Sequence, residues 1–293
     1  MIKVIKNSMF VLVIVCLTFA ILSAATSGQT KPTREKPIWS GESGGFKISW
    51  TEDNIVALDS QGKLVFSAKR LAENSWKEIS RDDPDAATKF EYNEDYRLLS
   101  VVGSIISYEH GVYCACGGVH PSANTSFVAL DLAHPGAIVF GYSDLNKNSK
   151  TAKLNEIFNE NDIFLALSAD SFVKKALQAG DQEKPKNLNQ LVKSIAYQSV
   201  DVGDCVFGAY EDMLTRFAFH HIENGKVAVR LGISHSAEVC RGLNTQIGIL
   251  LPIPEKLKND LALAESGKAG FLMKDQSKIA KDRSTHFSFG LSD

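Results

Sequence analysis

The sequence predicts an α+β fold in which an antiparallel β-sheet meander packs with a few amphipathic helices. Several short segments alternate apolar and polar residues with a period of two, whereas later segments carry apolar residues at the 3.6-residue spacing of a helix. The strands come in runs and the helices come in runs, which is typical of antiparallel sheets rather than of repeated βαβ units. The composition, with 44% hydrophobic and 23% charged residues among 293, is that of an ordinary globular protein.

The first strands are short and separated by polar turns. Phe46, Ile48 and Trp50 alternate with Lys47 and Ser49, the pattern of a half-buried strand. Further strands are predicted at Ile55–Leu58 and Leu64–Phe66, and a polar loop is predicted around residues 81–85.

The strongest β pattern covers residues 98–106. Its apolar residues fall on both faces of one candidate strand, with Leu98, Val102 and Ile106 on one side and Leu99, Val101 and Ile105 on the other. A strand of this kind is covered on both sides. His110-Gly111 is predicted to turn the chain, with return strands at Val112–Val119 and Phe127–Leu132.

The second half of the chain mixes helices with a hairpin. Asp162 is expected to cap a helix that ends near Gly180, and residues 188–195 form a second amphipathic helix. Asn224-Gly225 between two alternating segments predicts a hairpin with a tight turn. A last strand, Gln246–Leu251, is followed by a helix that begins after Pro254 and carries Leu257, Leu261 and Ala264 on one stripe.

The N-terminus has the pattern of a secretory signal peptide. Lys3 and Lys6 precede an apolar run from Met9 to Leu22, and small residues follow it. An uncleaved anchor is the alternative, but the run is short of the roughly 20 residues that a spanning helix needs. No later segment is apolar enough, so no membrane span is expected after signal removal. The predicted organisation is a signal peptide (1–25), a flexible leader (26–44), an N-terminal β-rich subdomain (45–150), a C-terminal α+β subdomain (151–266) and a polar tail (267–293).

Export changes the interpretation of the cysteines. Cys16 lies in the signal, which leaves four: Cys114, Cys116, Cys205 and Cys240. An even number in an oxidising compartment predicts two disulfides. A direct Cys114–Cys116 bond on a strand would be strained, so each of these two is expected to pair with Cys205 or Cys240. A zinc site or a redox pair are the less favoured alternatives, since the surroundings do not resemble a Cys-x-x-Cys motif.

Charge and motifs exclude several classes of function. Lys plus Arg is 32 and Asp plus Glu is 34, so nothing indicates a nucleic-acid partner. Phosphate-binding glycine loops, zinc-protease helices and nucleophile elbows are absent from the sequence, and no cofactor is predicted. His220 and His221 are adjacent on a strand and are expected to point to opposite faces, so no metal site is predicted.

One segment, residues 113–121, is unusual for its paired glycines. Gly117 and Gly118 permit backbone conformations closed to other residues, and His120 places a titratable ring beside them. The binding candidates are therefore Tyr113, Gly117, Gly118 and His120. A tight turn whose histidine bonds to backbone is the alternative interpretation, and both remain open.

This segment begins a resemblance to a known family. The order of elements is similar to that of the paired extracytoplasmic domain of unknown function in RsiV-like lysozyme-sensing anti-sigma factors and beside the catalytic domain of PdaC-like peptidoglycan deacetylases. The matching segments are Ser104–Tyr108, Gly117–His120, Phe127–Leu132, Leu154–Phe158, Phe217–His221, Val227–Leu231, Ser236–Gly242 and Ile249–Pro254. Val119 stands where alanine is common, and the cysteine pair is not part of that pattern. The resemblance spans roughly residues 46–263.

The resemblance implies an exported, non-enzymatic bacterial envelope protein, periplasmic or secreted, that binds a peptidoglycan fragment or a lysozyme-like partner. The sigma-binding segment and the deacetylase module of the family have no counterpart in the sequence. The alternative is an envelope glycan hydrolase that uses dispersed carboxylates and His120, which requires converging acidic groups in a cleft. A purely structural domain stabilised by its cysteines is a third hypothesis.

Overall fold

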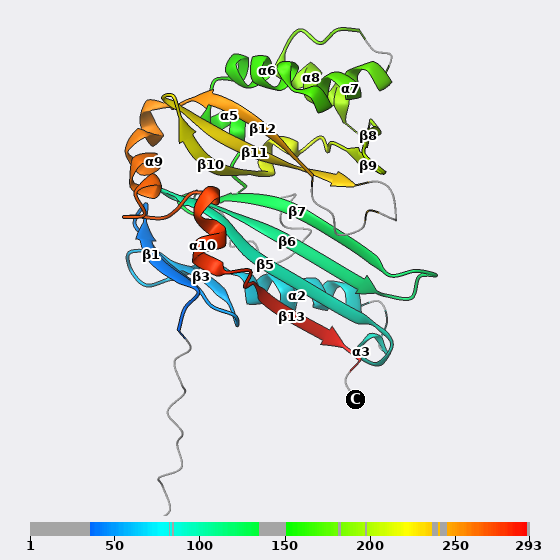
Figure 1. Cartoon of the computed structure of the whole chain (residues 1–293). Helices are drawn as coiled ribbons and strands as arrows, with labels where there is room; N and C mark the ends of the chain where they lie inside the picture. Colours follow the sequence, from blue (N-terminus) through cyan, green and yellow to red (C-terminus); the bar gives the residue numbers. More distant parts are fainter. Residues whose placement is uncertain are drawn as a thin grey trace, which may run out of the picture. The chain divides into compact units, whose positions relative to one another are not determined.

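The computed structural model describes residues 36–81, 83, 85–134, 151–180, 183–196, 198–235, 240 and 245–291. The predicted signal peptide, most of the predicted leader and most of the segment 236–242 lie outside these residues. From Pro37 onward the described residues belong to one unit. Helices and antiparallel sheets both contribute, which confirms the α+β prediction (Figure 1).

A four-stranded antiparallel sheet begins the described chain. Its strands, in spatial and in chain order, are β1 (Trp39–Ser43), β2 (Phe46–Trp50), β3 (Ile55–Leu58) and β4 (Leu64–Ser67). The last three occur where strands are predicted. β1 corrects the predicted leader, which ends before residue 39: Gly44 and Gly45 have φ angles of 57° and 83°, and this left-handed turn pairs Trp39 with Trp50.

Helix α2 (Ala68–Ser80) follows β4 directly and is absent from the predicted elements. The Ser67 hydroxyl caps it by accepting a hydrogen bond from the Arg70 N–H at 3.3 Å. One face of the helix is buried, through Ala68, Leu71, Ala72 and Ser75. A short helix, α3 (Ala86–Lys89), then leads into the next sheet.

The central sheet has the order β13-β5-β6-β7 and is the predicted antiparallel meander with one strand added. Its strands are β5 (Glu91–Val102), β6 (Ile105–Ala115), β7 (Ser122–Asp131) and β13 (Thr285–Gly290). The predicted turn at His110-Gly111 is wrong. The chain reverses at Gly103-Ser104, where Gly103 has φ 56°, and β6 continues through His110 to Ala115.

The faces predicted for residues 98–106 also need correction. A β-bulge between Leu98 and Ser100 shifts the alternation of side chains. Leu98 and Val101 therefore pack in one apolar core, while Val102 packs in another. Residues 98–106 are also not one strand, because the reversal at Gly103-Ser104 divides them between β5 and β6; the burial of apolar residues on both faces is confirmed.

The C-terminal segment is not a loosely held polar tail. Phe271 and Val101 exchange backbone hydrogen bonds of 3.0 and 2.9 Å, and β13 pairs along β5 from Thr285 to Gly290. Between them lie η4 (Met273–Asp275) and α10 (Gln276–Ala280). The buried side chains of Phe271, Leu272 and Ala280 anchor this polar segment, although they are few.

The remaining strands form a third antiparallel sheet. β12 (Thr245–Pro252) and β10 (Phe217–Glu223) both pair with β11 (Lys226–His235), which also pairs with β9 (Cys205–Gly208), itself next to β8 (Val200–Val202). The predicted hairpin at Asn224-Gly225 is confirmed, with φ angles of 51° and 73°.

Helices α5 (Leu154–Ile157), α6 (Glu160–Ala169), α7 (Ser171–Ala179) and α8 (Leu188–Ile195) precede this sheet in the chain, and Figure 1 shows α6, α7 and α8 grouped over it. The single helix predicted up to Gly180 is two helices, because Asp170 caps a new start by accepting hydrogen bonds from Phe172 and Val173. η1 (Met213–Thr215) leads into β10, and η3 (Glu255–Leu257) and α9 (Lys258–Glu265) follow β12. The predicted stripe Leu257, Leu261 and Ala264 is buried.

The apolar side chains form two main cores. One lies among β1–β4, α2 and one face of the central sheet, and it also takes in Phe271 and Ala280 from the C-terminal segment. The other joins α5–α9, the third sheet and the opposite face of the central sheet through Val102, Ile105 and Ala129. The central sheet is thus rigidly held between the two cores, and its far end, toward Ala115, supports the site described next.

Candidate functional site

The predicted binding residues lie at the end of β6 and in the bend that follows it. Tyr113 is half-buried on β6, whereas Gly117, Gly118 and His120 are exposed. Gly117 has φ 84°, a left-handed conformation that favours glycine. Val119, at the tip of the bend, is 94% exposed. The structure brings these residues together as a surface bend and does not place them in a pocket.

The two predicted disulfides are present, but with a different pairing. Cys114 is bonded to Cys116 and Cys205 to Cys240. The expected cross-pairing is wrong because β6 ends at Ala115: the bend there brings the Cys114 and Cys116 Cα atoms to 5.2 Å, within the usual range for a disulfide. In a fully extended strand, residues two apart are about 6.6 Å apart.

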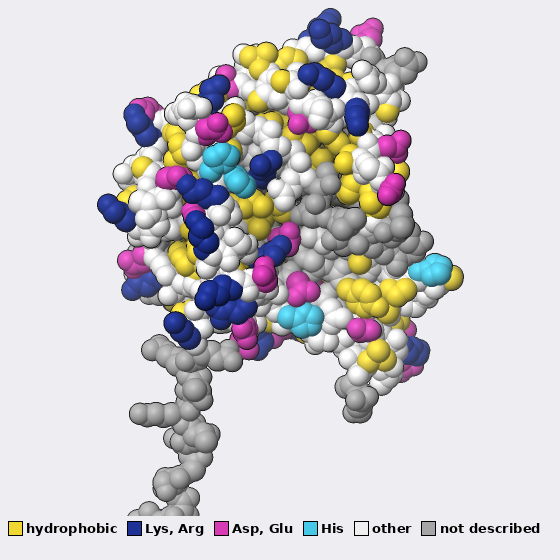
Figure 2. Space-filling model, viewed as in Figure 1, with side chains coloured by type: hydrophobic (Ala, Val, Ile, Leu, Met, Phe, Trp, Pro, Cys, Tyr) yellow, Lys and Arg dark blue, Asp and Glu magenta, His cyan; other side chains and the backbone are white. Residues whose placement is uncertain are grey.

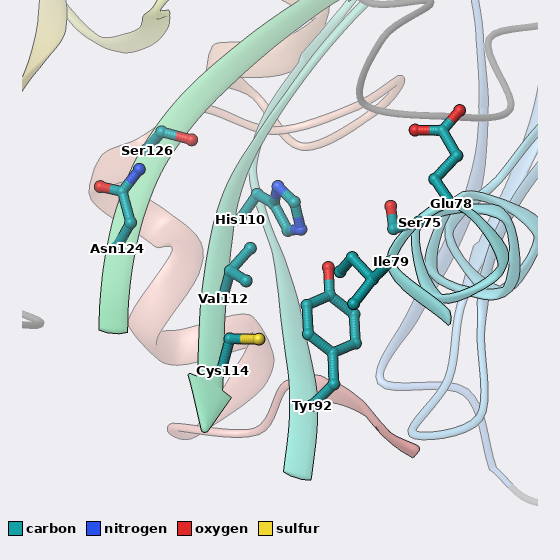
Figure 3. Close-up of a pocket in the computed structure, with 9 residues that line it drawn as sticks. All are labelled: Ser75, Glu78, Ile79, Tyr92, His110, Val112, Cys114, Asn124 and Ser126. Atoms are coloured by element: carbon teal, nitrogen blue, oxygen red, sulfur yellow. The ribbon is translucent and has the colours of Figure 1, made fainter. Parts of the chain in front are cut away.

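A pocket with a volume of about 360 Å³ lies between α2 and the β5–β7 meander, next to the Cys114 end of the bend. Figure 3 shows α2 on one side and the strands on the other, with His110, Val112 and Cys114 in a row along β6. The remaining lining residues are Ser75, Glu78 and Ile79 of α2, Tyr92 of β5, and Asn124 and Ser126 of β7.

Strand register explains why these side chains meet. His110, Val112 and Cys114 are two residues apart and so share a face of β6. In the β5–β6 pairing Tyr92 lies opposite Cys114, and in the β6–β7 pairing Ser126 lies opposite His110. Directly opposite residues of an antiparallel pair have neighbouring Cβ atoms, so the three strands form one continuous wall.

On the same face of β5 as Tyr92 lies a buried carboxylate, Glu94, whose side chain is fully inaccessible to solvent. The Tyr92 hydroxyl donates to its Oε1 and the Tyr96 hydroxyl to its Oε2. His110 Nε2 lies 2.8 Å from Oε2, and the His110 ring stacks on Tyr96 with centroids 4.6 Å apart. Buried charges persist in proteins when they are paired and hydrogen-bonded in this way.

The partners determine the ionisation of Glu94. Burial alone would raise the pKa of this carboxyl, but the hydrogen bond and charge of His110 and the two tyrosine hydroxyls outweigh it, and the pKa is lowered. The pKa of Tyr96 is raised well above its ordinary value by burial and by the negative charge of Glu94. Glu94 is therefore an anion that accepts three hydrogen bonds.

An anionic Glu94 also determines which ring nitrogen of His110 donates to it. A carboxylate only accepts hydrogen bonds, so Nε2 of His110 carries a proton, and Nδ1 is the ring nitrogen left for the pocket. Around it the pocket offers the Asn124 amide, the Ser126 hydroxyl, the Glu78 carboxylate and the apolar surfaces of Ile79 and Val112. A few fixed polar groups on an apolar wall are typical of small-ligand sites.

Sequence reasoning missed Glu94 and His110 because it ended the meander strand too early. With a turn placed at His110-Gly111, the ring falls at a strand end rather than inside the sheet. A usable pattern was present: Tyr92, Glu94 and Tyr96 alternate on one face of β5, which brings an acidic side chain between two tyrosines.

The adjacent histidines of β10 also differ from expectation. A β-bulge between Phe219 and His221 brings the Nδ1 atoms of His220 and His221 to 2.7 Å, rather than sending the rings to opposite faces. Burial first, then the charges of Arg230, His221 and Lys274, lower the pKa of His220. Among the described residues, no group of three or more His, Cys, Asp or Glu side chains is arranged to hold a metal ion.

The pocket and its buried pair cannot be interpreted through relatives. No protein-family model, curated protein or solved structure matches this chain.

In the part of the chain that the structure describes, no helix is long and apolar enough to cross a membrane. Acidic and basic side chains are intermixed over the face seen in Figure 2 rather than gathered by sign. The two disulfides are typical of proteins from oxidising compartments.

Proposed function

We propose that this protein is exported and, without catalysing a reaction, binds a peptidoglycan fragment in the pocket between α2 and the β5–β7 meander. The observation that carries the proposal is His110, which lines the pocket while its Nε2 is bound to buried Glu94. A ring held in this way presents Nδ1 to the pocket in a fixed position. Binding then requires little reordering of the site.

An N-acetylated amino sugar suits this pocket chemically. Its amide group and hydroxyls would hydrogen-bond to His110, Asn124 and Ser126, while its acetyl methyl group would contact Ile79 and Val112. The volume of about 360 Å³ lies at the small end of the range for ligand pockets, which favours one sugar residue with its substituents over a long glycan strand.

The arrangement of acidic groups favours binding over hydrolysis. Glycosidases generally flank the scissile bond with two carboxylates. Among the described residues that line this pocket, Glu78 alone supplies one, since Glu94 is fully buried beside His110. His120, the histidine expected in the hydrolase alternative, lies on the exposed bend outside the pocket.

Export of the chain is supported by the signal-peptide pattern of residues 1–25 and by the two disulfides. Mapping the N-terminus of the protein recovered from outside the cytoplasm tests this directly. A mature N-terminus near residue 26 is expected, and a protein retained in the cytoplasm would contradict the proposal.

A lysozyme-like partner is the second candidate, and the exposed bend favours it. Val119, 94% exposed between Gly118 and His120, is an apolar side chain at the tip of the bend that such a partner would cover. This partner would contact the bend, whereas a glycan fragment would occupy the pocket.

Isothermal titration with a soluble disaccharide-peptide from peptidoglycan, a chito-oligosaccharide and lysozyme separates these candidates. Saturable binding of the disaccharide-peptide at one site per chain is the expected result. If only lysozyme binds, the peptidoglycan assignment is wrong. Chromatography of the same mixtures after incubation checks for cleavage, and release of new reducing ends would establish the hydrolase instead.

A further inference from the structure

The two disulfides of this protein differ sharply in their setting. Cys205–Cys240 joins residues 35 apart, with Cys205 half-exposed and Cys240 only 1% exposed. Cys114–Cys116 encloses a single intervening residue, Ala115, and both of its cysteines are half-exposed. The entropic stabilisation from a disulfide grows with the length of the loop it closes, so Cys114–Cys116 contributes much less by this route than Cys205–Cys240.

The ends of the short disulfide are held differently. Cys114 lies in the β-ladder, opposite Tyr92 on one side and Ser122 on the other. Cys116 follows the last residue of β6 and begins the bend that continues through Gly117. Breaking the bond therefore releases Cys116 into a segment outside the sheet and leaves the strand pairing of Cys114 intact.

Cys114 also faces the pocket. It is one of the lining residues, and Figure 3 shows its sulfur directed from β6 toward the interior of the pocket, on the side of Tyr92. Half-exposed disulfides at the end of an element are the labile ones, whereas buried bonds that join distant segments resist reduction.

We propose that Cys114–Cys116 is a redox-active disulfide that exchanges with the dithiol of an exported thiol–disulfide oxidoreductase. The proposal is independent of the ligand of the pocket. Cys205–Cys240 remains the structural bond of the same chain and serves as an internal reference.

The exchange takes two steps. A thiolate of the partner dithiol attacks Sγ of Cys116, the intramolecular S–S bond breaks, and Cys114 leaves as a thiolate that takes a proton from solvent. The second thiolate of the partner then attacks its own sulfur in the mixed disulfide and releases Cys116, which is protonated in turn. In total the Cys114–Cys116 pair gains two electrons and two protons, and the partner dithiol becomes a disulfide.

Graded reduction of the native protein tests the proposal. The chain is equilibrated with a dithiothreitol series, alkylated, and mapped by mass spectrometry, while circular dichroism monitors the fold. Cys114–Cys116 is expected to open at about tenfold lower reductant than Cys205–Cys240, with the spectrum unchanged. Simultaneous opening of the two bonds, or opening of the short bond only when the fold is lost, would overturn the proposal.

A pair of single variants tests which sulfur is attacked. Cys114→Ser leaves Cys116 as a free thiol on the bend, and Cys116→Ser leaves Cys114 facing the pocket. With oxidised glutathione as the probe, Cys116 is expected to form the mixed disulfide about tenfold faster than Cys114. Equal rates, or a faster Cys114, would overturn the assignment of Cys116 as the attacked atom. The titration of the wild-type protein remains decisive if either variant folds poorly.

Discussion

His110 donates a hydrogen bond of 2.8 Å from Nε2 to Oε2 of Glu94, and both side chains are buried at the base of the pocket. The two residues come from neighbouring strands, β6 and β5, and Tyr96, opposite His110 in the strand pairing, stacks on its ring. The pair couples the stability of the fold to the geometry of the pocket, because any change at Glu94 alters both the core and the orientation of His110.

Glu94→Gln should destabilise the fold by about 3 kcal/mol, because breaking a buried charged pair leaves the remaining partners buried without the carboxylate that they bind. The amide retains one acceptor oxygen for three donors, namely the hydroxyls of Tyr92 and Tyr96 and Nε2 of His110. Urea denaturation followed by circular dichroism measures the difference in the free energy of unfolding.

The matched control is Glu42→Gln on β1. Glu42 is also a strand glutamate with a basic partner, but its pair with Lys47 is exposed on the surface, where ion pairs contribute about 0 to 1 kcal/mol. If the two variants lose similar amounts of stability, the buried network has no special role.

The pH dependence of stability should carry the signature of Glu94. Its pKa in the folded protein lies below the ordinary glutamate value of 4.5, so its contribution is fully present above that value and is lost as the pH falls through the folded-state pKa. The wild-type protein should therefore lose its stability advantage over Glu94→Gln as the pH drops below about 4.5.

Urea titrations of both proteins between neutral and acidic pH measure this difference, and subtraction cancels the contributions of the other carboxyl groups. A constant difference across that range would contradict the lowered pKa. A difference that grows with acidity would show a shift in the opposite direction.

Asn124→Ala and Ser126→Ala should each weaken binding of the peptidoglycan disaccharide-peptide by about tenfold, the effect of one lost hydrogen bond of about 1.4 kcal/mol. Both side chains line the pocket on β7. Thr125→Ala lies between them and, by strand alternation, on the opposite face, so it should leave the affinity unchanged. Equal losses in all three variants, measured by isothermal titration, would mean that the ligand does not occupy this pocket.

Local features of the fold were predictable from sequence because local chemistry determines them. Asn224-Gly225 adopts the left-handed angles of its hairpin, and the predicted 188–195 helix is present, with the Asn187 side chain as its cap. Glycines also account for an error: Gly103 and Gly111 are both plausible turn residues, and only Gly103 takes a positive φ.

Long-range pairings were not predictable in the same way. Nothing local in residues 285–290 indicates that they pair with β5, nearly 200 residues earlier, and the Glu94–His110 pair exists only once β5 and β6 are in register. The error in the disulfide pairing has a local cause instead. The prediction assumed that Cys114 and Cys116 both lie on an extended strand, but the strand ends between them, at Ala115.

Removing the two disulfides separately should have very different effects on stability. The Cys205→Ser, Cys240→Ser double variant no longer closes a loop of about 36 residues and should lose about 4 kcal/mol of stability. The Cys114→Ser, Cys116→Ser double variant opens a loop of only about three residues and should lose about 1.5 kcal/mol. Chemical denaturation of the two variants beside the wild-type protein under non-reducing conditions measures both losses. Each variant removes one disulfide and introduces two serines, so each is the control for the other. Equal losses, or a larger loss from the Cys114–Cys116 pair, would mean that the short disulfide stabilises the end of β6 in the native state and is a structural bond after all.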